Sequence, residues 1–146
     1  MRLKDCYEKG MLKHIPKNRE IIDKTIEMAK SDLEESERTH SNGSYVWSSV
    51  QVYTSMLNFA RAVLFSDGIK EKSHYCTVEY LRYHYWDHYG DLVDKLDILR
   101  RERHLSLYDS RDHITSEKVL ERINWCKEFS KKTYVLLDMN LKVKKK

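Results

Sequence analysis

Apolar residues recur every three or four positions through most of this chain, the spacing that puts them on one face of an α-helix. The segment 18–38 begins at Asn18, a residue type that favours the cap position before a helix. Its apolar positions step by four, three and four residues, namely Ile22, Ile26, Ala29 and Leu33. The same spacing predicts helices over residues 74–89 and 91–108, and another from about Thr115 onward.

The segment 44–66 is apolar on two sides. One stripe consists of Val46, Val50, Tyr53, Leu57, Ala60 and Leu64, and the other of Val52, Met56, Phe59 and Val63. A helix with two apolar sides is covered by other elements on both of them. This segment is therefore predicted to be the central helix of the fold.

Together these patterns indicate an all-α fold, an up-and-down antiparallel bundle of four to five helices. One Pro and four Gly in 146 residues leave few breaks, and short connections make successive helices antiparallel. Residues 1–15 are interpreted as a short amphipathic piece. We expect a single domain over residues 1–146, with a core at about 18–140 and a basic tail at 141–146.

The formal charge of +4 comes from 27 basic and 23 acidic residues, and four lysines stand within the last five positions. The rest of the chain is close to neutral, which argues against a broad nucleic-acid surface. The tail is interpreted as a solvated end, with loose phosphate contact as the alternative. No apolar run approaches the roughly 20 residues of a membrane span, and no signal-peptide pattern is present. A cytoplasmic protein with no membrane contact is expected.

The cysteines, Cys6, Cys76 and Cys126, are far apart and form no CxxC pair. This arrangement is typical of neither a disulfide framework nor a zinc site, so we expect three buried free thiols and no disulfide. His84 and His88 are four residues apart, as metal ligands often are, but spacing identifies no third ligand. Glycine-rich phosphate loops are absent from the sequence. We predict no metal site and no cofactor.

Candidate functional residues cluster in the segment 91–108. Its inner stripe, Leu92, Leu96 and Leu99, predicts an apolar residue at position 103, where the sequence has Arg103. Arg100, His104 and Tyr108 share an adjacent stripe. An inward arginine needs an anionic or polar partner. We interpret these four residues as a phosphate-binding patch, in which Arg100 and His104 are also the candidate catalytic pair. A structural ion pair or a subunit contact is the alternative.

The segment 74–89 is rich in aromatic rings, which are Tyr75, Tyr80, Tyr83, Tyr85, Trp86 and Tyr89. Such rings can stack on nucleic-acid bases. Helix packing and dimer contact are the alternative explanation.

Three ordered stretches carry a family resemblance. Residues 45–69 (YVWSSVQVYTSMLNFARAVLFSDGI) have an "ARA-L" run and a final "GI", and residues 72–81 (KSHYCTVEYL) are similar to a "K-THxGV" segment. Residues 99–119 (LRRERHLSLYDSRDHITSEKV) are similar to an "R-x-x-R-x-x-x-x-Y" segment followed by a short acidic loop. In this order, over about residues 18–140, the chain resembles the prokaryotic HEPN domains, particularly their archaeal branch.

The resemblance implies a helical bundle that is commonly a homodimer. Such domains are often encoded beside a minimal nucleotidyltransferase, sometimes as a toxin–antitoxin pair. Active members are metal-independent ribonucleases with a motif of Arg, four to six residues, then His. In this chain three residues separate Arg100 from His104, and residues 97–99 contain no arginine. Arg82 and His88 have the motif's spacing but belong to a different predicted helix.

The leading interpretation is a homodimeric binding module for a nucleotide, an RNA phosphate or a partner minimal nucleotidyltransferase. One alternative is a metal-independent endoribonuclease that uses Arg100 or Arg103 with His104. Another is a purely structural partner subunit.

Overall fold

The computed structural model describes the backbone of residues 1–106 and 114–144, and the side chains of residues 1–103 and 114–141. In chain order the elements are α1 (Leu3–Glu8), β1 (Leu12–His14), α2 (Arg19–Ser41), α3 (Tyr45–Ser66), β2 (Ile69–Glu71), α4 (His74–Tyr89), α5 (Leu92–Ser106) and α6 (Ser116–Lys144). The predicted all-α bundle is confirmed, with a small two-stranded sheet added. The last helix continues through residues 141–144, which the sequence analysis assigned to the tail.

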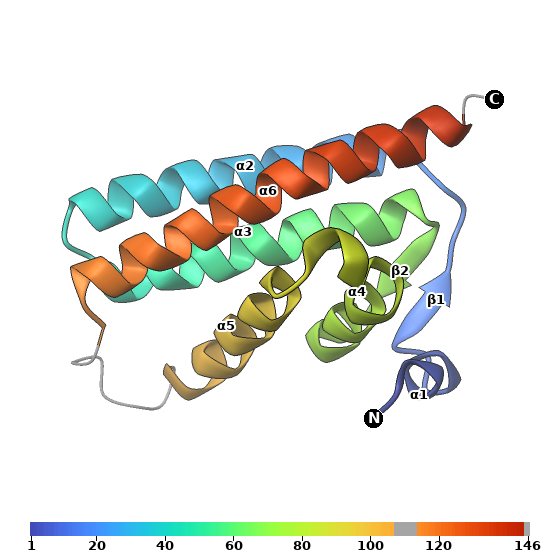
Figure 1. The fold of residues 1–146 in the computed structure, drawn as a ribbon, viewed down its shortest axis with the longest axis horizontal. Helices are drawn as coiled ribbons and strands as arrows, with labels where there is room; N and C mark the ends of the chain where they lie inside the picture. The colour runs from blue at the N-terminus through green and yellow to red at the C-terminus, as the bar shows by residue number, and fades with distance from the viewer. Residues whose placement is uncertain (107–113, 145–146) are drawn as a thin grey trace.

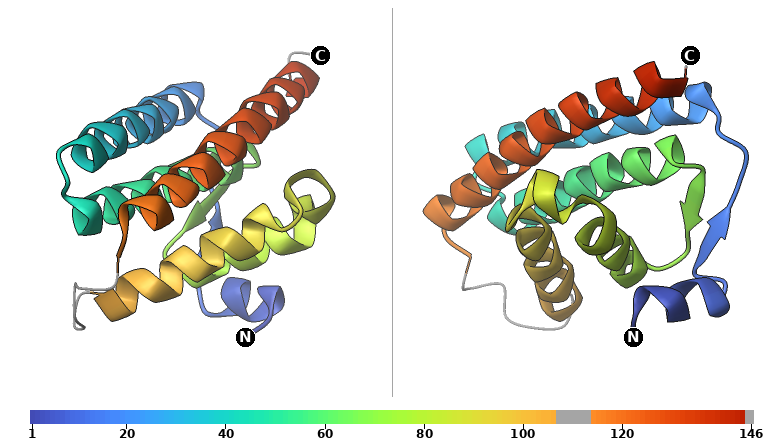
Figure 2. Two further views of the ribbon diagram at one scale, coloured as in Figure 1. Left: turned by 60° about the vertical axis from the view of Figure 1, so that its left-hand side comes forward. Right: turned by 45° about the vertical axis from the view of Figure 1, so that its right-hand side comes forward.

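Three long helices, α2, α3 and α6, form the extended part of the bundle, and α4 and α5 form a hairpin on the other side of α3 (Figure 1). The pairs α2–α3 and α4–α5 are antiparallel, as their short connections predict (Figure 2). The helix α1 and the two strands lie together beside α4 (Figure 2).

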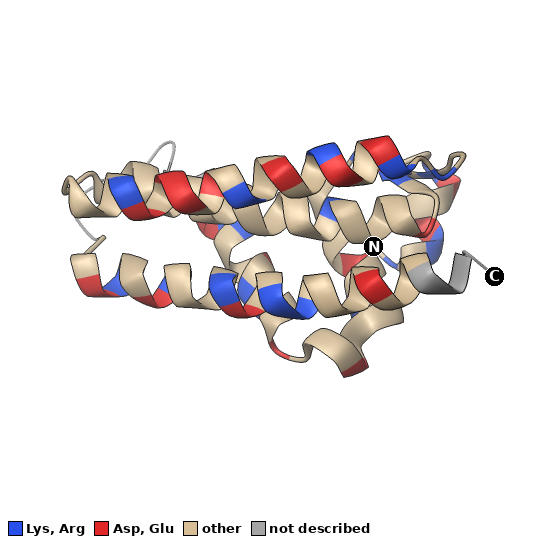
Figure 3. Cartoon of the chain, turned by 90° about the horizontal axis from the view of Figure 1, so that it is seen from above, with Lys and Arg blue, Asp and Glu red and all other residues tan. Residues whose placement is uncertain are grey.

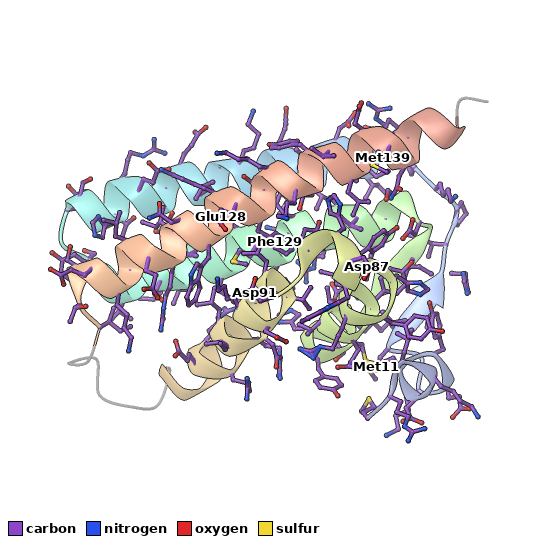
Figure 4. All side chains as sticks on the ribbon, in the orientation of Figure 1. Met11, Asp87, Asp91, Glu128, Phe129 and Met139 are labelled. Atoms are coloured by element: carbon purple, nitrogen blue, oxygen red, sulfur yellow. A yellow bond between two sulfur atoms is a disulfide. The ribbon has the colours of Figure 1, made fainter. Side chains whose placement is uncertain are left out.

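The central position predicted for the segment 44–66 is confirmed, because α3 packs against α2, α4, α5, α6 and β2. Every member of its two apolar stripes is buried except Val46 and Val50. From α6, Phe129 projects toward the helices beneath it (Figure 4) and stacks on Tyr89 of α4, with 4.4 Å between ring centroids. The core is therefore continuous from α6 through α3 to the α4–α5 hairpin.

Side-chain caps fix where three of the helices begin. The Asn18 side chain accepts hydrogen bonds from the backbone N–H groups of Glu20 and Ile21 at the start of α2, as predicted. At the start of α6, Thr115 accepts from Lys118 N–H at 3.1 Å. Ser73 accepts from Cys76 N–H at 3.2 Å and so defines the first turn of α4.

The strands β1 and β2 were not predicted. They pair antiparallel with Leu12 opposite Glu71 and His14 opposite Ile69, and three residues are too few to show an alternating pattern. Gly68, before β2, has φ +74°, and a Cβ there would lie 3.0 Å from the carbonyl oxygen of Ile15. Glycine at this position therefore permits the close approach of the two strands.

The prediction of three free thiols is wrong for Cys6 and Cys76, which form a buried disulfide between α1 and α4. The packing of α1 on α4 brings their Cα atoms to 5.8 Å, within the span of a disulfide. A separation of 70 residues leaves no spacing pattern in the sequence from which to infer this pair. Cys126 is a buried free thiol, as predicted, and burial raises its pKa to about 12.

Acidic and basic residues are interspersed along α2 and α6 (Figure 3). This mixture agrees with the near-neutral charge of the body of the chain. Of the helices that the structure describes, none has both the length and the apolar character needed to cross a membrane.

Candidate functional site

An open cavity of about 560 Å³ lies where α5 faces α3 and the start of α4. Its lining consists of Tyr53, Lys72, Ser73, His74, Tyr75, Arg100 and Arg103. Three of these described residues are cationic, and none is acidic. The cavity therefore has the charge of an anion-binding site.

The two arginines come from successive turns of α5 and lie against aromatic rings. The guanidinium carbon of Arg100 is 5.4 Å from the ring centroid of Tyr75, and that of Arg103 is 5.5 Å from the ring centroid of Tyr53. Both distances are within the range of cation–π attraction. Arg100 also pairs with Asp97 at 2.8 Å, which offsets part of its charge. The rings orient both cations on one wall of the cavity.

Tyr53 and His74 form a polar pair in the cavity lining, with 2.9 Å between the phenol oxygen and Nδ1 of the imidazole. Burial raises the pKa of Tyr53 to about 12, although Arg103 and Arg100 act in the opposite direction. Burial also lowers the pKa of His74. The negative charge of Glu71 acts to raise this pKa, whereas the positive charges of Arg61, Arg103 and Arg100 lower it further. At neutral pH the pair is therefore a protonated phenol beside a neutral imidazole, which can accept or donate a proton.

The first turn of α4 adds further positive potential. Ser73 caps this helix, and His74 and Tyr75 are its first two residues. The first N–H groups of a helix have no carbonyl partner within the helix, and the helix dipole makes this end partly positive. Such an end favours phosphate, and here it opens toward the arginines of α5.

A buried ion pair holds the segment that leads into α4. Glu71, the last residue of β2, accepts from Arg61 of α3 at 2.6 Å, and its side chain is 8% exposed. Arg61 also donates to Asn58, whose amide donates to Asp32 of α2 at 2.9 Å. This network fixes the position of β2 and so of the neighbouring cavity residues.

A second arginine network fixes α5. Arg122 of α6, whose side chain is 6% exposed, pairs with Glu102 of α5 and donates to Ser49 of α3 at 3.1 Å. Glu102 is next to Arg103 in sequence, so this contact holds the turn that carries the cavity arginine.

The predicted site residues are only partly described. Arg100 and Arg103 come together in the cavity lining, and their role in binding phosphate stays a prediction. His104 belongs to α5, but its side chain lies outside the described residues, and so does the whole of Tyr108. The catalytic pairing of Arg100 with His104 therefore stays a prediction.

Five lining residues were not part of the predicted patch, namely Tyr53, Lys72, Ser73, His74 and Tyr75. Tyr53 fits the apolar stripe of α3, and that pattern gives no sign of a role for its hydroxyl. The other four fall in the stretch 72–81, which the family resemblance includes. Of these, Tyr75 was also named among the rings that could stack on bases.

The histidine pair of α4 has other contacts. His88 lies 2.6 Å from the backbone carbonyl of Lys132 through Nε2, and the ring of His84 lies against Tyr80 with centroids 4.4 Å apart. Within the described part of the chain, no three His, Cys, Asp or Glu side chains are grouped so that they could hold a metal ion.

The family model described as HEPN domain matches residues 22–135 of the chain. The chain belongs to the HEPN family. The match spans more than three quarters of the 146 residues and includes every residue that lines the cavity. No curated protein matches the chain.

Membership of the HEPN family makes the chain a helical module related to nucleotides and RNA. Both α1 and β1, with Cys6, precede the matched segment. The disulfide therefore attaches an N-terminal addition to the HEPN core, next to the cavity.

Proposed function

We propose that this HEPN domain is a binding module whose cavity holds a phosphate group of a nucleotide or of RNA. The observation that carries the proposal is the lining: Lys72, Arg100 and Arg103 surround the first turn of α4, and no described lining residue is acidic. Arginine binds phosphate through charge-assisted hydrogen bonds in a planar fork. The neighbouring Asp97 offsets part of the charge of Arg100.

Binding of adenosine monophosphate and of a short RNA, measured at two salt concentrations, tests this proposal. Arg103→Ala is expected to weaken both affinities by about tenfold or more, because a hydrogen bond to a charged group contributes about 1.5–3 kcal/mol and one decade is about 1.4 kcal/mol.

The matched control is Arg101→Ala, which removes the same charge two residues away, from a side chain that is 62% exposed and outside the cavity. Circular dichroism checks that each variant folds. Equal affinities in the wild type and both variants would remove the cavity from the functional account.

A second candidate function is metal-independent RNA cleavage. The observation that favours it is His74, whose lowered pKa leaves it neutral near pH 7 beside two arginines. His104, the catalytic candidate predicted from the sequence, is the alternative acid–base group. RNA cleavage is measured with a chelator present, in the wild type, His74→Ala and His104→Ala. Loss in one variant identifies the acid–base residue, and an inactive wild type favours the pure binding module.

We also propose that two copies of this chain form a homodimer. Its proposed partner is a minimal nucleotidyltransferase, in a toxin–antitoxin-like pair. The support is the family, in which dimers are common, and an apolar strip on α6 of Tyr134, Val135 and Met139, each at least 41% exposed. Sedimentation equilibrium at micromolar concentration tests the dimer, and a monomer throughout contradicts it. A nucleotidyltransferase gene beside this one would support the partner, and its absence would favour a structural or free-standing role.

A further inference from the structure

A second cavity, of about 470 Å³, lies between α1 and α4. It is lined by Arg2, Leu3, Lys4, Glu79, Arg82 and Tyr83. Tyr83 is 74% exposed, and its ring meets only the edge of His84 among the described aromatic contacts, at 4.8 Å between centroids. A tyrosine so exposed adds little to the core, so its ring is available to a ligand.

The second cavity is next to the first. Tyr75 lines the first cavity, and Glu79, Arg82 and Tyr83 follow it at four, seven and eight residues along the same face of α4. The hydroxyl of Tyr75 donates to the carbonyl of Met1 at 2.7 Å, directly before Arg2. The two cavities therefore adjoin along α4, with Tyr75 between them.

We infer that a single-stranded RNA whose terminal phosphate occupies the first cavity continues along α4 and stacks a base on Tyr83. This inference rests on the proposed function and extends it from one phosphate to a strand. Aromatic side chains beside cations are the usual means of binding single strands. Arg82 is paired with Glu79 and Asp94, and Lys4 is in an exposed pair with Glu8 at 3.8 Å. Arg2, assisted by Lys4, is therefore the cation that faces the phosphates of the strand.

The spacing gives the length of RNA required. Eight residues of α-helix separate Tyr75 from Tyr83, a rise of about 12 Å. Stacked nucleotides advance by about 3.4 Å each. A mononucleotide in the first cavity cannot reach Tyr83, whereas a strand of about four nucleotides can.

A series of 5′-phosphorylated oligoadenylates of one to six nucleotides tests this path. In the wild type the affinity is expected to increase when the strand reaches about four nucleotides. Tyr83→Ala should remove this increase, lowering the affinity of the longer strands by about fivefold or more, as loss of one base stack does. The affinity of Tyr83→Ala for the mononucleotide should equal that of the wild type. Tyr83→Phe, which keeps the ring, should bind all strands as the wild type does.

The matched control is Trp47→Ala, which removes another exposed aromatic ring, from α3 and outside both cavities. An affinity that does not depend on strand length, or an equal loss in Trp47→Ala, overturns the path along α4. Mononucleotide binding that still depends on Arg103 would then leave the proposed function standing. If the wild type binds neither mononucleotide nor oligonucleotide, both are overturned.

Discussion

The guanidinium of Arg103 lies over the ring of Tyr53, with 5.5 Å between the guanidinium carbon and the ring centroid. This contact joins α5 to the central helix α3 at the wall of the cavity. The contact is a cation–π attraction between the guanidinium and the ring. Tyr53 therefore orients the cation at this wall.

Replacing the ring of Tyr53 tests this orientation. Tyr53→Leu should lower the affinity for adenosine monophosphate by about two- to fivefold, because a cation–π contact contributes about 0.5–1 kcal/mol. Tyr53→Phe keeps the ring and loses only the hydroxyl that meets His74, so its affinity should stay close to that of the wild type. Calorimetric titration of the two folded variants measures the difference, and equal losses in both would assign the effect to the hydroxyl.

Ligand binding should depend on the protonation of His74. Burial lowers its pKa below 6.5, so the imidazole gains its charge only as the pH falls beneath that value. As the pH falls, the phosphate affinity of the wild type should therefore increase more steeply than that of His74→Gln, which cannot gain this charge. Affinities measured between pH 5 and 8 on both proteins test this, and parallel curves would contradict it.

The same shift has a consequence for folding. With the pKa of His74 lowered in the folded state, the unfolded chain binds more protons near and below pH 6.5. The free energy of unfolding should therefore decrease as the pH falls through this range, and more so in the wild type than in His74→Gln. Urea titrations at a series of pH values give the comparison.

Reduction of the Cys6–Cys76 disulfide should destabilise the domain. In the chain-entropy description, a bridge across 70 residues contributes at most about 4 kcal/mol to the free energy of unfolding. Denaturant unfolding with and without reductant measures this contribution, and mass spectrometry of unreduced peptides establishes the bond.

The double variant Cys6→Ser, Cys76→Ser provides the control. Its stability should be low and should not respond to reductant, since the remaining Cys126 is a buried thiol without a disulfide. A wild type that is equally stable with and without reductant would argue that the bond does not form in solution.

Arg122 should contribute to stability through its contacts with α5 and α3. Arg122→Ala removes the pair with Glu102 and the hydrogen bond to Ser49, and the expected loss is about 1–3 kcal/mol. Lys127→Ala, on the same helix, breaks an exposed pair with Glu37, and its effect should stay within about 0.5 kcal/mol. Chemical denaturation compares them, and equal effects would mean that the buried network adds nothing.

The helices were predictable because each has a face that must be buried. The two apolar stripes of the segment 44–66 indicated a central helix, and Asn18 and Thr115 marked helix starts that the structure confirms. Such signals are local: they depend on residues within one or two turns of each other.

The features missed by the sequence analysis depend on contacts between distant segments. Cys6 and Cys76 meet only because α1 packs on α4, and Leu12 meets Glu71 only across the strand pair. The cavity is similar, since Tyr53, His74 and Arg103 come from three different helices. Among these three, only Arg103 was recognisable, because its charge interrupts an apolar stripe, and Arg100 was recognised beside it on the adjacent stripe.

The disulfide also divides the chain into parts that respond differently to mechanical force. If the two ends are pulled apart, the 70-residue ring closed by Cys6 and Cys76 cannot be extended while the bond is intact. The ring contains α2, α3 and both strands, so tension passes from Cys6 directly to Cys76. Only α4, α5 and α6 can then be drawn out, and the contour length released is shorter by about 230–250 Å than after reduction.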